Sequence, residues 1–349
     1  MKIALDATYS LGRNPSGVAT YSHKILFGLA RAHPEAGYLF CYRPQRFLRS
    51  FSERLPPNVS RRLLRENRIS SGDLFHGLNQ RLPAAKHPRS VSTFHDLFVI
   101  SGNYSTPEFR ARFTAQAHAA AERSDLIIAV SHFTARQVEQ LLHVEPSRIR
   151  VIHHGARPVR SQTGLTQDAI LSREPIILSV GAIQRRKNIC RLIEAFEQLD
   201  PGWSLVLAGS RGFGSEEILE RIKRSPRNKN IQVLGYISDS RLEKLYLTAS
   251  IFAFPSLDEG FGMPILDAMA RGVPVLTSNV SAMPEVAGGA ALLVDPTDVG
   301  SLTIGLRQLA TDSGLRETLT RAGLARASQL TWEKSLEATW KVYEELLLT

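Results

Sequence analysis

Two carboxylates, Glu259 and Asp267, stand eight residues apart in a segment suited to chemistry. Glu259 follows a short apolar run that ends at Phe254, and Asp267 falls about one turn into the helix that Pro264 predicts. Because carboxylates accept hydrogen bonds and do not donate them, different hydroxyls of one sugar are natural partners. The alternative interpretation is two unrelated acids, one of which stabilises the start of a helix.

Three consecutive cations, Arg185, Arg186 and Lys187, open a second helix shortly after Gly181 and a buried strand. A cation at a helix N-terminus is unfavourable by about 0.3–1 kcal/mol, and a bound anion would reverse that effect. A pyrophosphate needs a forked donor and a point charge, which Arg186 and Lys187 supply. A solvated basic turn is the alternative. However, these cations stand at a helix N-terminus, where they are unfavourable, and at the place where an α/β fold binds its ligand, which favours an anion site.

Glycines lie in the remaining loops that precede helices. Gly17, in the segment Asn14–Gly17, would let the backbone approach a phosphate at the first helix. Gly260 and Gly262, on either side of Phe261, leave backbone N–H groups uncovered beside Glu259. A steric reason for each glycine is the simpler alternative, so these loops support a phosphate site only together with the cations.

Short apolar strands alternate with helical patterns along the chain, which predicts parallel sheets covered on both faces. Strands are expected in ranges that include 2–7, 38–42, 90–95, 176–180, 204–208 and 251–254. The polar segment 156–174 is typical of a linker, after which the alternation restarts. We therefore expect an α/β chain of two doubly wound, Rossmann-like domains facing a central cleft, over 1–160 and 161–331, with a final helix over 332–349.

Composition excludes several classes of protein. The chain has 349 residues, of which 43% are hydrophobic and 22% charged, so it can bury two cores and is not intrinsically disordered. No apolar run approaches the roughly 18 residues of a membrane-spanning helix. The start MKIALD does not resemble a signal peptide, and Cys41 and Cys190 are read as reduced packing residues. These features indicate a cytoplasmic protein.

The net charge of +10 comes from the first half of the chain. Residues 1–160 hold 23 basic and 11 acidic side chains, whereas the remainder holds 20 and 22. Much of the excess is interleaved with apolar residues in one segment, at Arg43, Arg46, Arg49, Arg54, Arg61, Arg62, Arg65 and Arg68. Such a surface fits anionic lipid, an acidic glycan or nucleic acid, and a merely solubilising face is the alternative.

Together these motifs resemble the retaining glycosyltransferases of family 4, in the GT-B class, over nearly the whole chain. EGFGMPILDAMARGVPVLTS resembles the family's pair of acids separated by seven residues, and GAIQRRKN resembles its phosphate-binding loop. FHDLF, SDLIIAVSHFTAR and the Gly17 loop resemble its acceptor-side domain. Among family members, the bacterial mannosyltransferases that extend surface polysaccharides, such as O-antigen and other lipopolysaccharide chains, are the subgroup we suggest.

The resemblance implies a role for each matching residue. Glu259 would contact the donor sugar, with backbone N–H groups of Gly260, Phe261 and Gly262 nearby, and Asp267 would hold the nucleotide ribose. Arg186 and Lys187, with Arg185 and Gly181 beside them, would neutralise the diphosphate, and Gly17 would approach it from the other domain. His95 would lie near the transferred sugar, and a role as general base is open although the family's front-face mechanism does not need one. No metal or other cofactor is implied, and the final helix would cross back onto the first domain.

This sequence departs from the family pattern at three positions. Asp267 stands where glutamate is usual, His154 where asparagine is common, and Ala182 where some members carry arginine. The shorter carboxylate of Asp267 can shift the ribose contact or route it through water. His76 and His132 are alternative histidines for a site, but a structural role is the simpler interpretation of each.

The function predicted from sequence is transfer of a hexosyl unit, with mannose from GDP-mannose as first choice, to a lipid-linked or polysaccharide acceptor. UDP-glucose or another UDP-sugar is the alternative donor. A non-catalytic nucleotide- or nucleic-acid-binding protein is a second class, although the basic segment lacks an interleaved aromatic platform for single strands, which disfavours nucleic acid. A phosphorylase or epimerase of the same fold is a third. Peripheral contact of Arg43–Arg68 with an anionic membrane, at the inner face of the cell membrane, completes the expectation.

Overall fold

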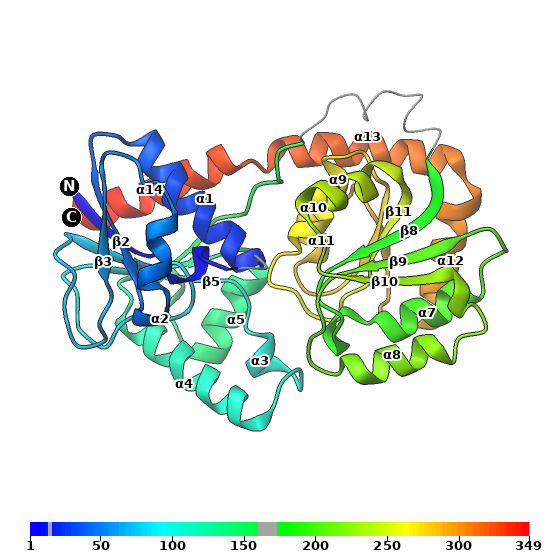
Figure 1. The fold of residues 1–349 in the computed structure, drawn as a ribbon, viewed down its shortest axis with the longest axis horizontal. Helices are drawn as coiled ribbons and strands as arrows, with labels where there is room; N and C mark the ends of the chain where they lie inside the picture. Colours follow the sequence, from blue (N-terminus) through cyan, green and yellow to red (C-terminus); the bar gives the residue numbers. More distant parts are fainter. Residues whose placement is uncertain (13–15, 160–172, 349) are drawn as a thin grey trace. The chain divides into compact units, whose positions relative to one another are not determined.

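The computed structural model describes residues 1–12, 16–159 and 173–348, which divide into two compact units (Figure 1). The first unit comprises Met1–His154 and Trp332–Thr349, and the second comprises Gly155–Thr331. Asn14 and Pro15 of the first glycine loop, and positions 160–172 of the expected linker, lie outside the described residues. Every helix in the described parts is too short or too polar to cross a bilayer.

The first unit is built on a seven-stranded parallel sheet in the order β3-β2-β1-β4-β5-β6-β7. Its strands are β1 (Lys2–Asp6), β2 (Gly37–Tyr42), β3 (Val59–Leu63), β4 (Leu74–Gly77), β5 (Ser90–Phe94), β6 (Leu126–Ala129) and β7 (Ile149–Val151). Its helices are α1 (Gly17–Ala32), α2 (Pro44–Phe47), α3 (Phe98–Ser101), α4 (Pro107–Arg123), α5 (His132–Leu142) and α14 (Trp332–Leu347). Strand order reverses between β1 and β4, so the loops after these strands form the position where such sheets bind ligands.

The second unit repeats this plan with six parallel strands in the order β10-β9-β8-β11-β12-β13. Its strands are β8 (Glu174–Val180), β9 (Ser204–Ala208), β10 (Ile231–Gly235), β11 (Ala249–Phe254), β12 (Val275–Ser278) and β13 (Leu292–Val294). Its helices are α7 (Ile189–Glu197), α8 (Ser215–Lys223), α9 (Asp239–Thr248), α10 (Met263–Met269), α11 (Met283–Ala287), α12 (Val299–Thr311) and α13 (Ser313–Gln329). The predicted α/β fold with two doubly wound sheets is confirmed, and the reversal of order here lies between β8 and β11.

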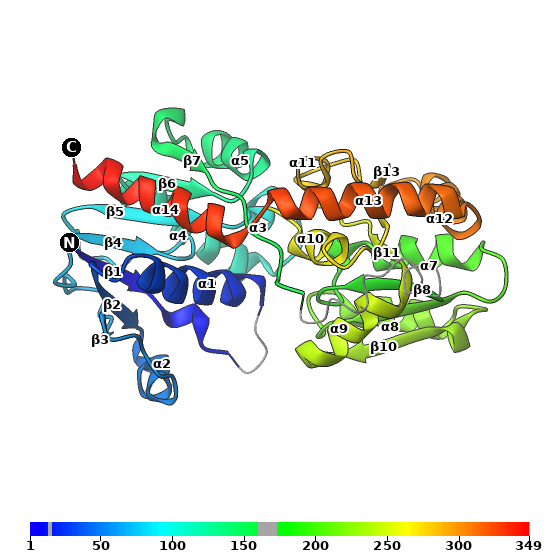
Figure 2. The same ribbon diagram turned by 90° about the horizontal axis from the view of Figure 1, so that it is seen from above.

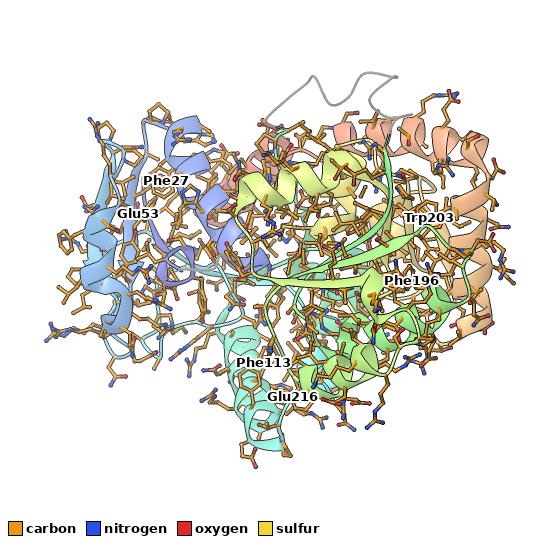
Figure 3. All side chains as sticks on the ribbon, turned by 45° about the vertical axis from the view of Figure 1, so that its right-hand side comes forward. Phe27, Glu53, Phe113, Phe196, Trp203 and Glu216 are labelled. Atoms are coloured by element: carbon orange, nitrogen blue, oxygen red, sulfur yellow. The ribbon has the colours of Figure 1, made fainter. Side chains whose placement is uncertain are left out.

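The central strand β11 shows why its sequence is apolar throughout. Ile251 and Ala253 point into the cluster formed with α7, α8 and α12, to which Phe196 of α7 belongs (Figure 3). The alternate residues Phe252 and Phe254 are equally buried, and the Phe252 ring packs 5.7 Å from that of Tyr246 in α9. A strand covered on both faces has no polar side, so the continuous apolar run is the expected pattern.

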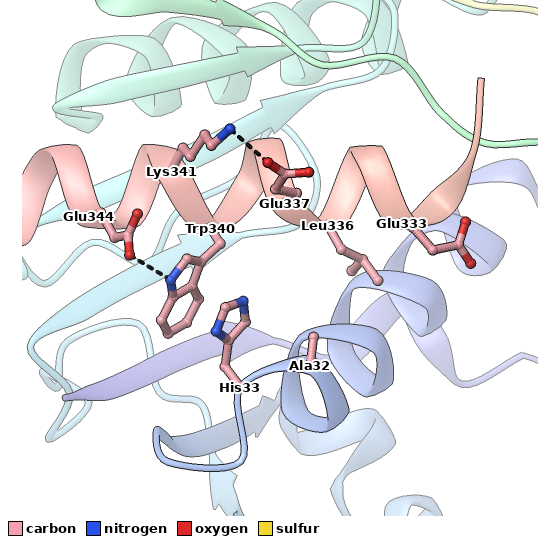
Figure 4. A pocket seen from close by; sticks show the side chains of 8 residues that line it. All are labelled: Ala32, His33, Glu333, Leu336, Glu337, Trp340, Lys341 and Glu344. Atoms are coloured by element: carbon pink, nitrogen blue, oxygen red, sulfur yellow. Dashed lines mark hydrogen bonds and ion pairs between the residues drawn. The ribbon is translucent and has the colours of Figure 1, made fainter. Parts of the chain in front are cut away.

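The C-terminal helix α14 packs beside α1 in the first unit (Figures 1 and 2). The rings of His33 and Trp340 stack with centroids 3.6 Å apart, and both line a shallow pocket between the helices (Figure 4). Gly28 permits this approach, because a Cβ there would lie 2.6 Å from a methyl carbon of Leu336. The Trp340 indole donates to Glu344 at 2.9 Å, which satisfies its N–H group in a largely apolar contact.

The basic segment Arg43–Arg68 is not one uniform surface. Arg43 is buried beside Asp6, at 3.6 Å, and also pairs with Glu66, so it does not belong to an exposed basic face. Arg61 lies in edge strand β3, where its Nε donates to the Ser50 carbonyl at 3.1 Å and its guanidinium covers the Phe51 ring. The sequence pattern did not indicate a strand here, because Val59–Leu63 is polar at three of five positions and lacks the alternation of a half-buried strand.

Candidate active site

The two sequence motifs meet at the switch point of the second sheet. Strands β8 and β11 pair directly, and their chains continue at the carboxyl edge into the loops Gly181–Lys187 and Pro255–Gly262. The Leu257 N–H donates to the Arg186 carbonyl at 2.8 Å, which ties one loop to the other. The topology therefore brings residues more than seventy positions apart into one cluster.

Glu259 lies between two cations of the first loop. Its Oε2 is 2.8 Å from Nη1 of Arg186, and its Oε1 accepts from Nζ of Lys187. Arg186 also donates to the Asp258 carbonyl. The side chains of all three residues are about nine-tenths buried, so these contacts are little screened by solvent.

Electrostatics keep this cluster charged. Burial alone would raise the pKa of Glu259, but Arg186 and Lys187 outweigh it and hold the pKa at about 2. Two cations against one carboxylate leave the cluster with one unit of positive charge. The cations near the start of α7 thus already have an anion inside the protein, which the sequence argument had assigned to a ligand alone. The remaining positive charge still suits an incoming phosphate.

Packing fixes where Lys187 points. Its ammonium lies 4.5 Å from the centre of the Phe254 ring, and its aliphatic chain covers Gly181. Gly181 has a φ of +144°, and a Cβ at that position would stand 3.1 Å from Cε of Lys187. The backbone conformation therefore favours glycine, and a Cβ at this position would also press on the lysine side chain.

Arg185 is not part of the cluster, although the sequence placed it beside its neighbours. Its guanidinium pairs with Glu217 of α8 at 2.8 Å, and more than half of the side chain is exposed. The short 3₁₀ turn Arg185–Lys187 directs consecutive side chains in different directions, so only two of the three cations reach Glu259.

Sequence reasoning missed Ser281, which holds the backbone of Glu259 in place. The Ser281 hydroxyl accepts from the Glu259 N–H at 2.8 Å and donates to the Glu259 carbonyl at 2.6 Å. Ser281 adopts a φ of +61°, a left-handed conformation that costs a non-glycine residue energy and is often found at functional sites. An isolated serine in a loop carries no signal that would have revealed this contact.

Replacing Ser281 with alanine should lower kcat/KM for the transfer predicted from the sequence about thirtyfold, because two hydrogen bonds that orient Glu259 are lost at about 1 kcal/mol each. Steady-state kinetics on purified protein would measure it. Ser250→Ala is the matched control, since Ser250 donates to the Glu174 carbonyl at 2.6 Å, near the start of β11. Equal losses in the two variants would show that Ser281 has no special link to the site.

Asp267 lies on α10 in the same unit but contacts a different cation. Its Oδ1 accepts from the Arg157 N–H at 2.9 Å, and its Oδ2 lies 3.3 Å from Nε of the same residue. Burial raises the pKa of Asp267, and Arg157 partly offsets that shift. Gly260, Phe261 and Gly262 connect this helix to Glu259, and Gly262 precedes α10 with a φ of +95°.

Gly17 and His95 belong to the first unit. Gly17 is exposed at the first position of α1, after the N-cap Ser16. His95 is buried at the end of β5, where its Nε2 is 3.0 Å from the Leu78 carbonyl. Because a carbonyl only accepts, Nε2 carries the proton, and burial lowers the pKa of His95 to about 4. The ring is therefore neutral at pH 7 with Nδ1 as an acceptor.

The other histidines have different surroundings. Both nitrogens of His76 are occupied, by the Tyr343 hydroxyl at 2.6 Å and the Thr93 hydroxyl at 2.8 Å, which indicates a structural role. His132 begins α5, with its ring 6.0 Å from that of His153. His154 is buried against Trp332, with ring centroids 5.7 Å apart.

The fold and the site together define a class of protein. It has two parallel α/β sheets, and the second sheet carries a buried cluster of cations and a carboxylate that suits a phosphorylated ligand. Residues 16–160 match the family described as Glycosyltransferase Family 4, and residues 166–326 match Glycosyl transferases group 1. O-antigen chain mannosyltransferase B of Escherichia coli is 34% identical over 284 residues, covering 78% of this chain and 74% of that protein. The chain belongs to glycosyltransferase family 4, whose members are retaining hexosyltransferases.

Two further proteins are similar over most of this chain. The serotype-specific mannosyltransferase WbdA of Escherichia coli is 29% identical over 290 residues, covering 76% of this chain but 35% of that longer protein. The structure of Alr3699/HepE of Anabaena, in complex with UDP and glucose, superposes with a TM-score of 0.75 and 18% identity, over 99% of this chain and 100% of that one. The second likeness concerns the fold, which is the GT-B arrangement.

Proposed function

We propose that this enzyme transfers mannose from GDP-mannose to a lipid-linked or polysaccharide acceptor in the synthesis of a cell-surface glycan. The cluster of Arg186, Lys187 and Glu259 at the switch point of the second sheet is the observation that carries the donor site. The choice of mannose is supported by the two mannosyltransferases of Escherichia coli described above.

The charges of the cluster fit the departure of a nucleoside diphosphate. The bond between the anomeric carbon and the phosphate oxygen breaks, and the acceptor oxygen bonds to the same face of the sugar, which retains the configuration. The acceptor proton passes to the leaving phosphate. Arg186 and Lys187 would stabilise the charge that builds up on that phosphate, and fixed charges of this kind usually contribute most to catalysis.

In this proposal Glu259 holds the two cations that bind the diphosphate and also accepts hydrogen bonds from the sugar. A carboxylate offers about four acceptor sites, and Arg186 and Lys187 use one on each oxygen. The remaining acceptor sites are of the kind that hydrogen bonds from sugar hydroxyls require. Because its pKa is held at about 2, Glu259 stays ionised at every working pH and does not act as a general acid.

The state of His95 favours positioning over base catalysis. Its Nε2 proton is committed to the Leu78 carbonyl, and a pKa near 4 makes Nδ1 a weak base at pH 7. A neutral imidazole acceptor is suited to a hydrogen bond from a sugar hydroxyl. We therefore assign His95 to orientation of the transferred sugar.

A transfer assay tests the proposal directly. Purified enzyme with GDP-mannose and a mannose-terminated lipid-linked oligosaccharide should give one added mannose in the α configuration, read by mass spectrometry and NMR. A parallel reaction with UDP-glucose tests the alternative that the UDP and glucose of the Anabaena structure raise. If neither donor is consumed in the presence of acceptors, the non-catalytic nucleotide-binding alternative gains; a β-linked product would contradict the mechanism.

The exposed part of the basic segment supports contact with an anionic membrane. Arg49, Arg54, Arg62, Arg65 and Arg68 are exposed, and we call this group the basic edge. Leu48, Phe51 and Ile69 stand 82%, 62% and 61% exposed in the same segment, an unusual density of large apolar side chains. Arginines beside exposed apolar groups suit insertion at a lipid headgroup layer. The proposal puts the enzyme in the cytoplasm, at the inner face of the cell membrane.

Reversing the charge of Arg62, Arg65 and Arg68 together should weaken binding to vesicles containing phosphatidylglycerol by about a hundredfold, at about 1 kcal/mol for each lost arginine. Arg61 is left intact because it holds Ser50. Sedimentation with vesicles at low salt measures the effect. The same reversal at the exposed Arg224, Lys229 and Lys244 of the second unit changes net charge equally. Identical binding of both triple variants would contradict a dedicated surface.

A further inference from the structure

Arg157 lies against Asp267, the residue that the sequence assigns to the donor's ribose. Its main-chain N–H is 2.9 Å from Oδ1 of Asp267, and its Nε is 3.3 Å from Oδ2. Its Nη1 lies 3.7 Å from Oδ1 of Asp239 at the start of α9. One guanidinium is thus flanked by two carboxylates from different helices.

Exposure separates the two partners. The side chain of Asp267 is 4% exposed, whereas that of Arg157 is 31% exposed. Both oxygens of the Asp267 carboxylate already face Arg157. The group that this pair presents at the surface is therefore the guanidinium, with Asp267 behind it.

We propose that Arg157 donates to the ribose hydroxyl oxygens of the donor nucleotide, while Asp267 acts by holding Arg157 in position. This inference rests on the proposed donor site. It reverses the direction of the hydrogen bond to the ribose, because a guanidinium only donates hydrogen bonds and a carboxylate only accepts them. Arg157 becomes a specificity-determining residue, and Asp267 a positioning residue.

The comparison of GDP with 2′,3′-dideoxy-GDP isolates this contact. A hydrogen bond to a charged group predicts that wild-type enzyme binds GDP about tenfold or more tightly than the dideoxy form. In Arg157→Ala the ratio of the two dissociation constants should fall to near one. The main-chain contact to Asp267 survives this substitution, so Asp267 stays anchored and becomes more exposed. Direct ribose binding by Asp267 would therefore keep or raise the ratio in Arg157→Ala.

Further variants keep the test decisive. Arg157→Lys should restore part of the ratio, as should millimolar guanidinium added to Arg157→Ala, and a purely structural role predicts neither. Asp239→Asn is the control on the exposed partner and should change the ratio less than threefold. Thermal unfolding confirms that each variant is folded.

The outcomes separate this inference from the proposed function. Wild-type binding of GDP with a ratio that Arg157→Ala preserves and Asp267→Asn abolishes would overturn the inference and leave the donor site standing. Failure of wild-type enzyme to bind GDP, UDP or ADP would overturn both.

Discussion

Lys187→Ala should lower kcat/KM for transfer by about 10²–10³-fold. This is the usual cost of removing one fixed positive charge that stabilises a developing anion. Lys187 is one of the two cations in contact with Glu259, so its loss leaves the cluster with no net positive charge. The diphosphate then meets a neutral site. Initial rates over a range of donor concentrations should show a lower kcat and a higher KM for the donor.

Arg185→Ala is the matched control for Lys187→Ala. The two residues are two positions apart in one basic run, but Arg185 pairs with Glu217 away from the cluster. We expect its kcat/KM to stay within about threefold of wild type, because an exposed ion pair contributes about 1 kcal/mol or less. A loss in Arg185→Ala as large as that in Lys187→Ala would mean that the phosphate site is not the pair seen here.

Glu259→Gln should change binding and turnover in opposite directions. The substitution raises the charge of the cluster from one positive unit to two, so GDP should bind about tenfold more tightly, as expected for a nearby charge in a partly screened site. Transfer should fall by about 10²–10³, because the acceptor for sugar hydroxyls and the partner of two cations is lost. Calorimetry and steady-state kinetics on one preparation measure both quantities.

The same variant should change how stability depends on pH. The pKa of Glu259 is about 2 in the folded chain, against an ordinary value of 4.5. Its ion pairs therefore stabilise the fold fully above pH 4.5, and this stabilisation is lost as the pH falls toward 2. Glu259→Gln should remove that part of the acid dependence, which denaturant titrations at pH 6 and pH 4 would detect.

Much of the fold followed from local patterns. The strands 204–208 and 251–254 could be predicted because each is a short apolar run, and the helix 107–123 because its length and pattern fit a helix. Edge strand β3 escaped prediction, since Val59–Leu63 is polar at three of five positions and pairs on one side alone. Arg43 was misread for a related reason: the acids that bury it, Asp6 and Glu66, are far from it in sequence.

The candidate site was predictable in part. Arg186, Lys187 and Glu259 could be named because their loops follow strands that lie side by side in any doubly wound sheet. The contact of Arg157 with Asp267 spans 110 positions, and that of Ser281 with Glu259 spans 22. Neither residue carries a local pattern, so only the folded chain could reveal them.

The most direct test of the central claim is calorimetric titration of the wild-type enzyme and Lys187→Ala with GDP, UDP and ADP in the absence of added metal. We expect wild-type enzyme to bind GDP more tightly than UDP or ADP, and Lys187→Ala to lose most of that affinity. Tighter binding of UDP than of GDP would change the proposed donor to a UDP-sugar and leave the proposed diphosphate site unchanged. No binding of any nucleotide, or equal binding by wild type and Lys187→Ala, would contradict the assignment of this cluster as the donor diphosphate site.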